Sequence, residues 1–332
     1  MSASVISAEP QARPRPGLRD DSVARWLMPA PAVLLLAGFT IWPLIQIVRL
    51  SFATVKPGRE PVWVGLANYE RFLGDATFWI ALRNTAVFTV SAVGLELALG
   101  MALALLLQGE VTKWRTTLRT LFLLPMVLSP VVVGITWRAL LTPEFGWVNQ
   151  MLGFHVGWLS DPDLALFTLI AVDAWQWTPF TFVILLAGLL GLPPDADEAA
   201  RVDGANAWQR FRLVTLPMLA PLIAIVAVLR AIDASKVFDL VYNLTQGGPG
   251  TATETLAFYM YRLAFRSFDQ GYAATISVVL SVIVGVLVAV SEQLHGRVEQ
   301  QQPEQQEHER RQRQQRGPDR DEDHPHDESE HD

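Results

Sequence analysis

The chain contains 332 residues, of which 51% are hydrophobic and 18% are charged, and its mean hydropathy is positive. So much apolar sequence is unusual in a soluble domain of this size, so the composition indicates a membrane protein. The absence of cysteine excludes a disulfide framework and thiol chemistry.

The first 25 residues are polar and rich in proline and arginine. No short apolar core with a small-residue cleavage site precedes the first long apolar run. We therefore expect a disordered cytoplasmic tail over residues 1–25, followed by a first span that acts as an uncleaved signal anchor.

Six long apolar runs follow this tail, and each is close to or above the roughly 20 residues that cross a bilayer core of about 30 Å. In lipid the backbone polar groups must pair internally, so the runs are predicted to be helices. The runs are 27–50, 84–107, 118–141, 164–192, 217–234 and 273–290. The sequence thus predicts an all-α membrane domain with six spans over residues 26–295.

The lysines and arginines that flank these runs predict the orientation of the chain. The tail 1–25 holds four arginines, the loop after the second span holds Lys113, Arg115 and Arg119, and the loop 193–217 holds three arginines. The loop 142–163 holds no lysine or arginine. We therefore expect a multi-pass protein of a bacterial or archaeal cytoplasmic membrane, with both termini and the loop 193–217 in the cytoplasm.

The loop 193–217 is longer than a simple turn needs and has a regular pattern. Two prolines end the preceding span, and acidic residues at 195, 197 and 198 fall in a predicted first helical turn, where the helix dipole favours them. Gly204 is expected to interrupt this helix after about two turns. Residues 205–215 predict a second short helix, with Trp208, Phe211 and Leu216 on one face, and Pro217 is expected to begin the fifth span.

Four ionisable residues lie inside the predicted spans, where a charge costs roughly 2.5–3.5 kcal/mol on insertion scales. They are Glu96 in the second span, Asp173 in the fourth, and Arg230 with Asp233 in the fifth. Arg230 and Asp233 are three residues apart and therefore share a helical face, so a purely structural pair is the alternative for these two. Two roles are equally open for Glu96, namely a hydrogen bond inside the bundle and contact with the transported solute. All four are candidates for the substrate pathway.

Beside Asp173 lie Trp175, Gln176 and Trp177, the remaining substrate-pathway candidates. Two indole rings and an amide suit a sugar, whose ring has apolar faces and a rim of hydroxyls. The alternative is a cluster of aromatic residues that serves only packing.

Residues 296–332 hold twelve acidic and six basic side chains and almost no apolar ones, so they contribute −6 of the net charge of −7. Such a segment cannot bury enough surface to fold, so a disordered, charged cytoplasmic tail is expected. His324, His326 and His331 could bind stray metal, but a solvated tail is the preferred interpretation. No metal site is expected elsewhere, and no nucleic acid is expected as a partner.

No catalytic signature is present, including the phosphate-binding loop of ATPases. The chain is therefore not expected to be an enzyme, and energised transport would need a partner. A secondary transporter or channel that works without ATP remains an alternative, although no convincing internal repeat supports it. A membrane enzyme is disfavoured by the missing catalytic residues.

The loop 193–217 resembles the EAA loop of ABC importer permeases, and we call it the EAA loop. The family pattern is Glu-Ala-Ala, three residues, Gly, nine residues, Ile, one residue, Leu-Pro. The matching positions are Glu198, Ala199, Ala200, Gly204, Val214, Leu216 and Pro217. The one departure is Val214 in place of isoleucine.

The resemblance extends over about residues 26–295 and is to the carbohydrate-uptake branch, of maltose and glycerol-phosphate type. It is carried by residues 65–69, by Asn84-Thr85, by Trp177 with Pro179-Phe180, by Phe238-Asp239 and by the segment 244–249 with the threonines and tyrosines that follow it. The Gly247-Gly248-Pro249 sequence alone indicates only a tight turn.

The resemblance implies the type I ABC importer permease fold, a heterodimer with a second permease, two copies of an ABC ATPase and an extracytoplasmic sugar-binding protein. ATP and Mg would be bound by the ATPase, with no cofactor in this chain.

ATP-driven motion of the EAA loop would drive alternating access. Glu198 would pair with the ATPase, Gly204 would let the backbone turn, and Phe211 and Leu216 would anchor the loop; Ala199, Ala200, Asp203 and Pro217 complete the coupling set. An ABC permease for a non-sugar solute is a further alternative.

Overall fold

The computed structural model describes residues 29–108, 113–153, 155–289 and 293. The tails predicted at 1–25 and 296–332, with His324, His326 and His331, lie outside these residues. The described chain is mainly helical, and its β structure is one antiparallel pair, β1 (Ala53–Thr54) with β2 (Val62–Trp63).

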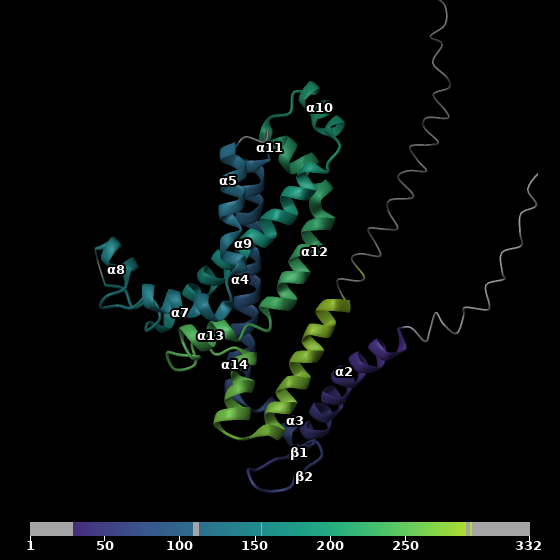
Figure 1. Cartoon of the computed structure of the whole chain (residues 1–332), viewed down its shortest axis with the longest axis vertical. Helices are drawn as coiled ribbons and strands as arrows, with labels where there is room; N and C mark the ends of the chain where they lie inside the picture. The colour runs from purple at the N-terminus through teal and green to yellow at the C-terminus, as the bar shows by residue number, and fades with distance from the viewer. Residues whose placement is uncertain (1–28, 109–112, 154, 290–292, 294–332) are drawn as a thin grey trace, which may run out of the picture.

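Two long helices, α4 (Ala76–Leu107) and α9 (Pro162–Leu190), form the centre of the molecule (Figure 1). They pack closely because glycine and small residues lie at their contact: a Cβ added to Gly100 would lie 2.8 Å from Cγ2 of Thr181. Phe88, Phe182 and Leu185, all fully buried, fill the core beside them. Helix α4 begins at Ala76, eight residues before the predicted second span, because the Asp75 side chain accepts a hydrogen bond from the Thr77 N–H and caps it.

The predicted third span, 118–141, is not one straight helix. It consists of α5 (Lys113–Phe122), α6 (Leu124–Val127) and α7 (Pro130–Leu140), with a bend of 99° between the two halves. Ser129 precedes Pro130 and has extended backbone angles, φ −62° and ψ 136°, because the proline ring disfavours a helical residue before it. The expectation of an uninterrupted helix was therefore wrong, and this proline was the signal it missed.

Helix α12 (Leu216–Ala234) packs against α4 and α9 and stops where α13 (Asp239–Leu244) begins a new direction. Helix α13 packs against α7, and α8 (Trp147–Leu152) projects from the side of the molecule (Figure 1). The loop helices α10 (Pro194–Val202) and α11 (Ala207–Arg210) lie at one end of the molecule, which we call the EAA-loop end (Figure 1).

The opposite end contains the β pair, α3 (Ala67–Leu73), α14 (Leu256–Tyr261) and the π-helical turn η2 (Arg262–Arg266). From here the last helix, Gln270–Ala289, runs back toward the middle (Figure 1). Helix α2 (Ala30–Ser51) joins the bundle only at this end, and Ser51 is its one buried residue.

Five helices are long and apolar enough to cross a membrane, and six spans result when the bent pair counts as one. The all-α architecture and the approximate positions of the spans are thus confirmed within the described chain. The first and last spans agree with their predicted positions to within three residues at the ends that are described.

The close contact between α4 and α9 gives a direct test. Gly100→Ala should destabilise the protein by about 1–3 kcal/mol, because the new methyl group meets the backbone nitrogen of Phe182 at 3.0 Å as well as Thr181. Gly94→Ala in the same helix is the matched control, since its Cβ meets nothing within 4 Å and alanine favours a helix. Thermal unfolding of the detergent-purified protein measures both, and equal melting temperatures would contradict the packing described.

Candidate functional site

The first half of the EAA loop is a short, exposed helix that ends at a glycine. Helix α10 (Pro194–Val202) carries Asp195 and Asp197 in its first turn, as expected. Gly204 follows it with a φ of +80°, a left-handed conformation that favours glycine. The Ala205 N–H donates to the Ala200 carbonyl at 3.0 Å and closes the turn. The predicted interruption at Gly204 is confirmed.

The second half of the EAA loop differs from the prediction. Helix α11 (Ala207–Arg210) begins at 207 and not at 205, because Asn206 and Gln209 form a reciprocal capping box. It continues through the π-helical turn η1 (Phe211–Thr215) into α12, so that Ala207–Ala234 is one continuous helix. Pro217 therefore does not start a separate span; the wide turn before it accommodates the missing N–H.

One carboxylate fastens the two halves of the loop together. Asp197 lies 2.6 Å from Arg201 on its own helix and 2.9 Å from Arg210 on the next. An ion pair therefore links the two short helices, although neither buries a residue.

The outer surface of the EAA loop mixes charge with large apolar side chains. Glu198, Ala199 and Asp203 are exposed and Ala200 is half-buried. The apolar members are Val202, Trp208 and Leu213, each at least 66% exposed. Such a surface is typical of a protein-binding site.

The predicted anchors of the loop lie at different depths. Phe211 is half-buried, with its ring 5.7 Å from that of Trp208. Leu216 is 37% exposed, whereas Leu219, one turn later, is buried against α9. Leu219 therefore contributes more packing than Leu216.

The four ionisable residues of the spans lie together in one place, which we call the membrane ion cluster. Arg230 binds Glu96 through two hydrogen bonds, at 2.6 and 2.9 Å, and Asp173 at 3.2 Å. Arg230 also lies 2.6 Å from Asp233 on its own helix. Glu96 is fully buried, and Asp173 and Arg230 are 5% and 2% exposed, whereas the Asp233 side chain is 58% exposed. The cluster thus joins α4, α9 and α12 and has one exposed end.

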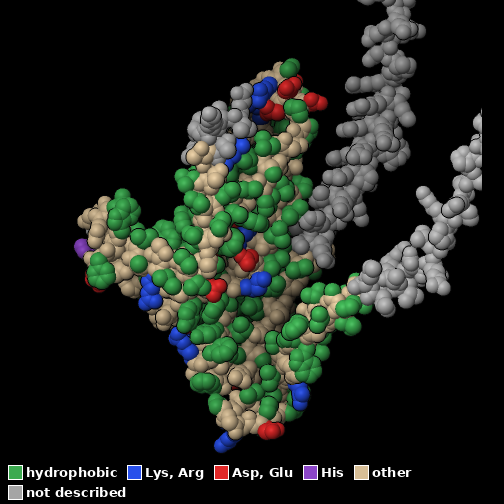
Figure 2. Space-filling model, in the orientation of Figure 1, with side chains coloured by type: hydrophobic (Ala, Val, Ile, Leu, Met, Phe, Trp, Pro, Cys, Tyr) green, Lys and Arg blue, Asp and Glu red, His purple; other side chains and the backbone are tan. Residues whose placement is uncertain are grey.

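The ion cluster interrupts an otherwise apolar region. Figure 2 shows a surface that is mostly hydrophobic along the bundle, with charged side chains at the EAA-loop end, at the opposite end and in a small group between them. Trp177 adds to the cluster, because the Arg230 guanidinium lies 4.6 Å from its ring centroid.

The other two members of the tryptophan group face different surroundings. Gln176 is buried and its amide donates to the Leu128 carbonyl at 3.0 Å, beside the break in the third span. Trp175 is 42% exposed and packs edge-on against Trp137 at 5.5 Å. Consecutive helical residues diverge by about 100°, so Trp175, Gln176 and Trp177 do not line one common opening.

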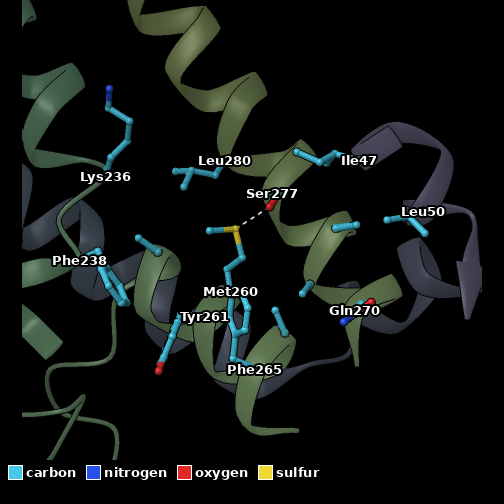
Figure 3. A pocket seen from close by; sticks show the side chains of 14 residues that line it. Ile47, Leu50, Lys236, Phe238, Met260, Tyr261, Phe265, Gln270, Ser277 and Leu280 are labelled. Atoms are coloured by element: carbon cyan, nitrogen blue, oxygen red, sulfur yellow. Dashed lines mark hydrogen bonds between the residues drawn. The ribbon is translucent and has the colours of Figure 1, made fainter. Parts of the chain in front are cut away.

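A pocket of about 590 Å³ lies between α2, α14 and the last helix, and we call it the α14 pocket (Figure 3). Its wall is mainly apolar, with Phe238, Met260 and Tyr261 on one side and the last helix on the other. Its polar lining residues are Lys236, Gln270 and Ser277, and the Ser277 hydroxyl contacts the sulfur of Met260.

Aromatic rings continue from this pocket toward α13. The Tyr261 ring lies 5.3 Å from Phe265, 5.0 Å from Phe238 and 5.5 Å from Tyr242. Phe265 is 66% exposed. Sequence reasoning did not assign this group, although the alternation of aromatic residues over 258–265 was a usable signal.

A second polar network, which the sequence did not reveal, lies at the opposite end of the molecule. Asp75 accepts hydrogen bonds from the hydroxyls of Tyr259 and Tyr272, the latter at 2.7 Å. Arg71 lies 3.9 Å above the Tyr272 ring and 2.6 Å from Asp269. These contacts join α3, α4, α14 and the last helix, which come from distant parts of the sequence.

Comparison with known proteins places the chain in a family. A model described as the inner membrane component of binding-protein-dependent transport systems matches residues 96–301. A probable ABC transporter permease of Sinorhizobium fredii is 42% identical over 277 residues, 82% of this chain and 89% of that protein. The trehalose/maltose transport system permease of Thermococcus litoralis is 38% identical over 269 residues, 78% of this chain and 89% of that protein.

The fold has a solved counterpart. A chain from the crystal structure of a bacterial ABC transporter involved in the import of the acidic polysaccharide alginate superposes with a TM-score of 0.72 at 25% identity. The match covers 84% of this chain and 98% of that one.

The chain therefore belongs to the inner-membrane components of binding-protein-dependent transport systems. It is a multi-pass permease, a transport component, and the expected type I ABC importer permease fold is confirmed. These relatives do not favour a secondary transporter, a channel or a membrane enzyme.

The network around Asp75 predicts a pH dependence of stability. Burial alone raises the pKa of the Asp75 carboxyl, but hydrogen bonds from Tyr259, Tyr272 and the Thr77 N–H lower the pKa below its ordinary value. The stability that depends on this charge is present above the unfolded pKa near 4 and is lost as the pH falls through the folded value. Asp75→Asn should cost about 1 kcal/mol at pH 7, and its difference from the unmodified chain should narrow as the pH falls below about 4 toward the folded pKa.

Thermal unfolding between pH 7 and pH 3 measures this effect. Glu60→Gln, at an exposed carboxylate in the loop between β1 and β2, is the control and should leave stability nearly unchanged. A constant gap between Asp75→Asn and the unmodified chain at every pH would contradict the prediction.

Proposed function

We propose that the chain is one of two different permease subunits in an ATP-driven importer of sugars. Its similarity to the trehalose/maltose permease along most of both chains is the observation that carries the proposal. The termini and the EAA loop face the cytoplasm in this proposal, in agreement with the arginines of the flanking segments.

Two copies of an ABC ATPase bind from the cytoplasm and hold the ATP and Mg, because this chain has no phosphate-binding loop. The exposed mixture of charged and apolar residues on the EAA loop supports a protein partner there. An extracytoplasmic binding protein delivers the sugar. A second permease covers this one, which is supported by α2, whose apolar residues are unburied along the helix.

The mechanism proposed is alternating access. Closure of the ATPase pair displaces the EAA loop, in which Asp197 keeps α10 and α11 together so that they move as one body. Because α11 continues into α12, the displacement enters the membrane along a single helix. Glu198 offers an exposed carboxylate to a basic residue of the ATPase.

The cargo proposed is a neutral sugar or polyol. The α14 pocket offers the aromatic faces of Phe238, Tyr261 and Phe265 for stacking on a sugar ring, and Gln270 and Ser277 for its hydroxyls. Its one charged lining residue, Lys236, supports an acidic sugar as the second candidate.

Glu198→Lys should abolish sugar uptake and detach the ATPase from the membrane, since it places a cation where the basic partner residue binds. Glu144→Lys makes the same charge change at an exposed site outside the EAA loop and is the matched control. Co-purification of the ATPase with the tagged permease, together with uptake in cells, measures both. A Glu198→Lys complex that keeps its ATPase and transports normally would refute the coupling role.

The charge of the cargo is tested through Lys236. For a neutral sugar, Lys236→Gln should change half-maximal stimulation of ATP hydrolysis by no more than about twofold; for an acidic sugar the loss should be about tenfold, near 1.4 kcal/mol. Lys56→Gln, at an exposed lysine outside the pocket, is the control. The reconstituted complex is assayed with neutral disaccharides, polyols, uronic-acid oligosaccharides and amino acids. Stimulation by an amino acid alone would overturn the sugar assignment.

A further inference from the structure

The EAA loop and the membrane ion cluster are parts of one continuous helix (Figure 1). The helix Ala207–Ala234 carries Phe211, in the turn η1 within the EAA loop, and Arg230, in α12 within the cluster. The helical path runs through η1 and through Pro221 without a break. The helix is therefore a direct path by which movement of the loop reaches Arg230.

The rest of α12 is attached weakly to the bundle. Only 11% of its apolar window is buried, and its buried residues are Leu219, Val226, Arg230 and Ala234. The first two make apolar contacts, which are not directional. Arg230 differs, because three of its nitrogens bind carboxylates, two of which belong to α4 and α9.

Arg230 is the point of α12 that resists translation most strongly. Helices α4 and α9 pack closely against each other, so Glu96 and Asp173 form a fixed pair of acceptors. Sliding α12 past them by one turn would leave a buried guanidinium and two buried carboxylates unpaired, which is strongly unfavourable. Rotation about Arg230 keeps these bonds, whereas sliding breaks them.

The helical segments before and after Arg230 have very different lengths. Nineteen residues separate it from Phe211, about 28 Å of helix, whereas Asp233 follows after about 5 Å. Beyond Asp233 the chain continues to Lys236 and Phe238, which line the α14 pocket. The short side thus ends at the pocket.

We propose that Arg230, held by Glu96 and Asp173, is the pivot about which α12 turns, so that movement of the EAA loop is converted into movement of the opposite sense at the α14 pocket. This inference rests on the proposed function, because it assigns to Arg230 a positioning role in the coupling of the EAA loop to the pathway. Arg230 itself is enclosed by protein and keeps its carboxylate partners throughout the movement.

The absence of native cysteine makes the movement measurable with paired spin labels. One pair joins Met218→Cys, on the long side of α12 and outside the EAA loop, to Leu106→Cys on α4; the second joins Lys236→Cys to Val90→Cys on α4. Leu106 and Val90 are each at least 70% exposed, Met218 is 39% exposed and Lys236 is exposed. The complete complex, purified through a tag on this chain, is measured by pulsed electron resonance without nucleotide and after trapping with ATP and vanadate. Both distances should change, the first by several times more than the second.

The pivot is then removed without leaving a buried charge. The triple variant Glu96→Leu, Asp173→Leu and Arg230→Met replaces the buried ions by apolar side chains, a change that is often neutral or stabilising. The Met218–Leu106 change should persist, and the Lys236–Val90 change should fall at least about fivefold. The matched control is Glu254→Leu with Arg262→Met, which removes another pair with a buried carboxylate, at 2.8 Å, that is not on α12. It should leave both changes intact.

If the triple variant does not reach the membrane, a milder variant tests whether Arg230 is the pivot of α12. Arg230→Lys keeps the charge but loses the two-bond contact with Glu96, and it should reduce the Lys236–Val90 change by at least about twofold. An unaltered Lys236–Val90 change in either variant would overturn the pivot. If trapping moves neither pair in the unmodified complex, the proposed coupling function fails instead, so the two failures are distinguishable.

Discussion

The permease depends on one arrangement of charge, in which Arg230 is bound by carboxylates from two other helices inside the apolar bundle. An ion in this position is tolerated only when it is paired, so the cluster fixes which faces of α4, α9 and α12 meet. The apolar packing around the cluster selects the register of the helices less strongly, because leucine and valine side chains offer no directional bonds. The charged residues therefore specify the register of the bundle, whereas the apolar residues keep it in the membrane.

The two ends of the molecule are built on different principles. At the EAA-loop end, short helices are fixed by Asp197 and by a capping box, with almost nothing buried. At the opposite end, Tyr259 and Tyr272 converge on Asp75 within a buried network. The first leaves its surface available for contact with a partner protein, whereas the second ties distant parts of the chain together.

Much of this architecture was predictable from sequence, because span length and the pattern of the EAA loop depend on local rules. Gly204 at a helix end and acidic residues in the first turn of α10 are of this kind. The bend at Pro130 was also readable from local rules. The pairing of Arg230 with Glu96 and Asp173 was not, because the partners lie 134 and 57 residues away along the chain. The same holds for Asp75 and its tyrosines, where long-range packing alone decides the contact.

Helix α2 is attached to the bundle at its Ser51 end alone, where the Asn68 amide donates to the carbonyls of Ser51 and Ala53 and Thr275 donates to that of Ser51. A helix of 22 residues is about 33 Å long, so a rotation of 10° at Ser51 displaces its free end by about 6 Å. The reach of α2 is therefore set by a few hydrogen bonds and not by its own sequence. Substitutions around Asn68 would change the space between α2 and the bundle, and so the size of the protein that fits there. The permease could in this way acquire new partners without any change in its core.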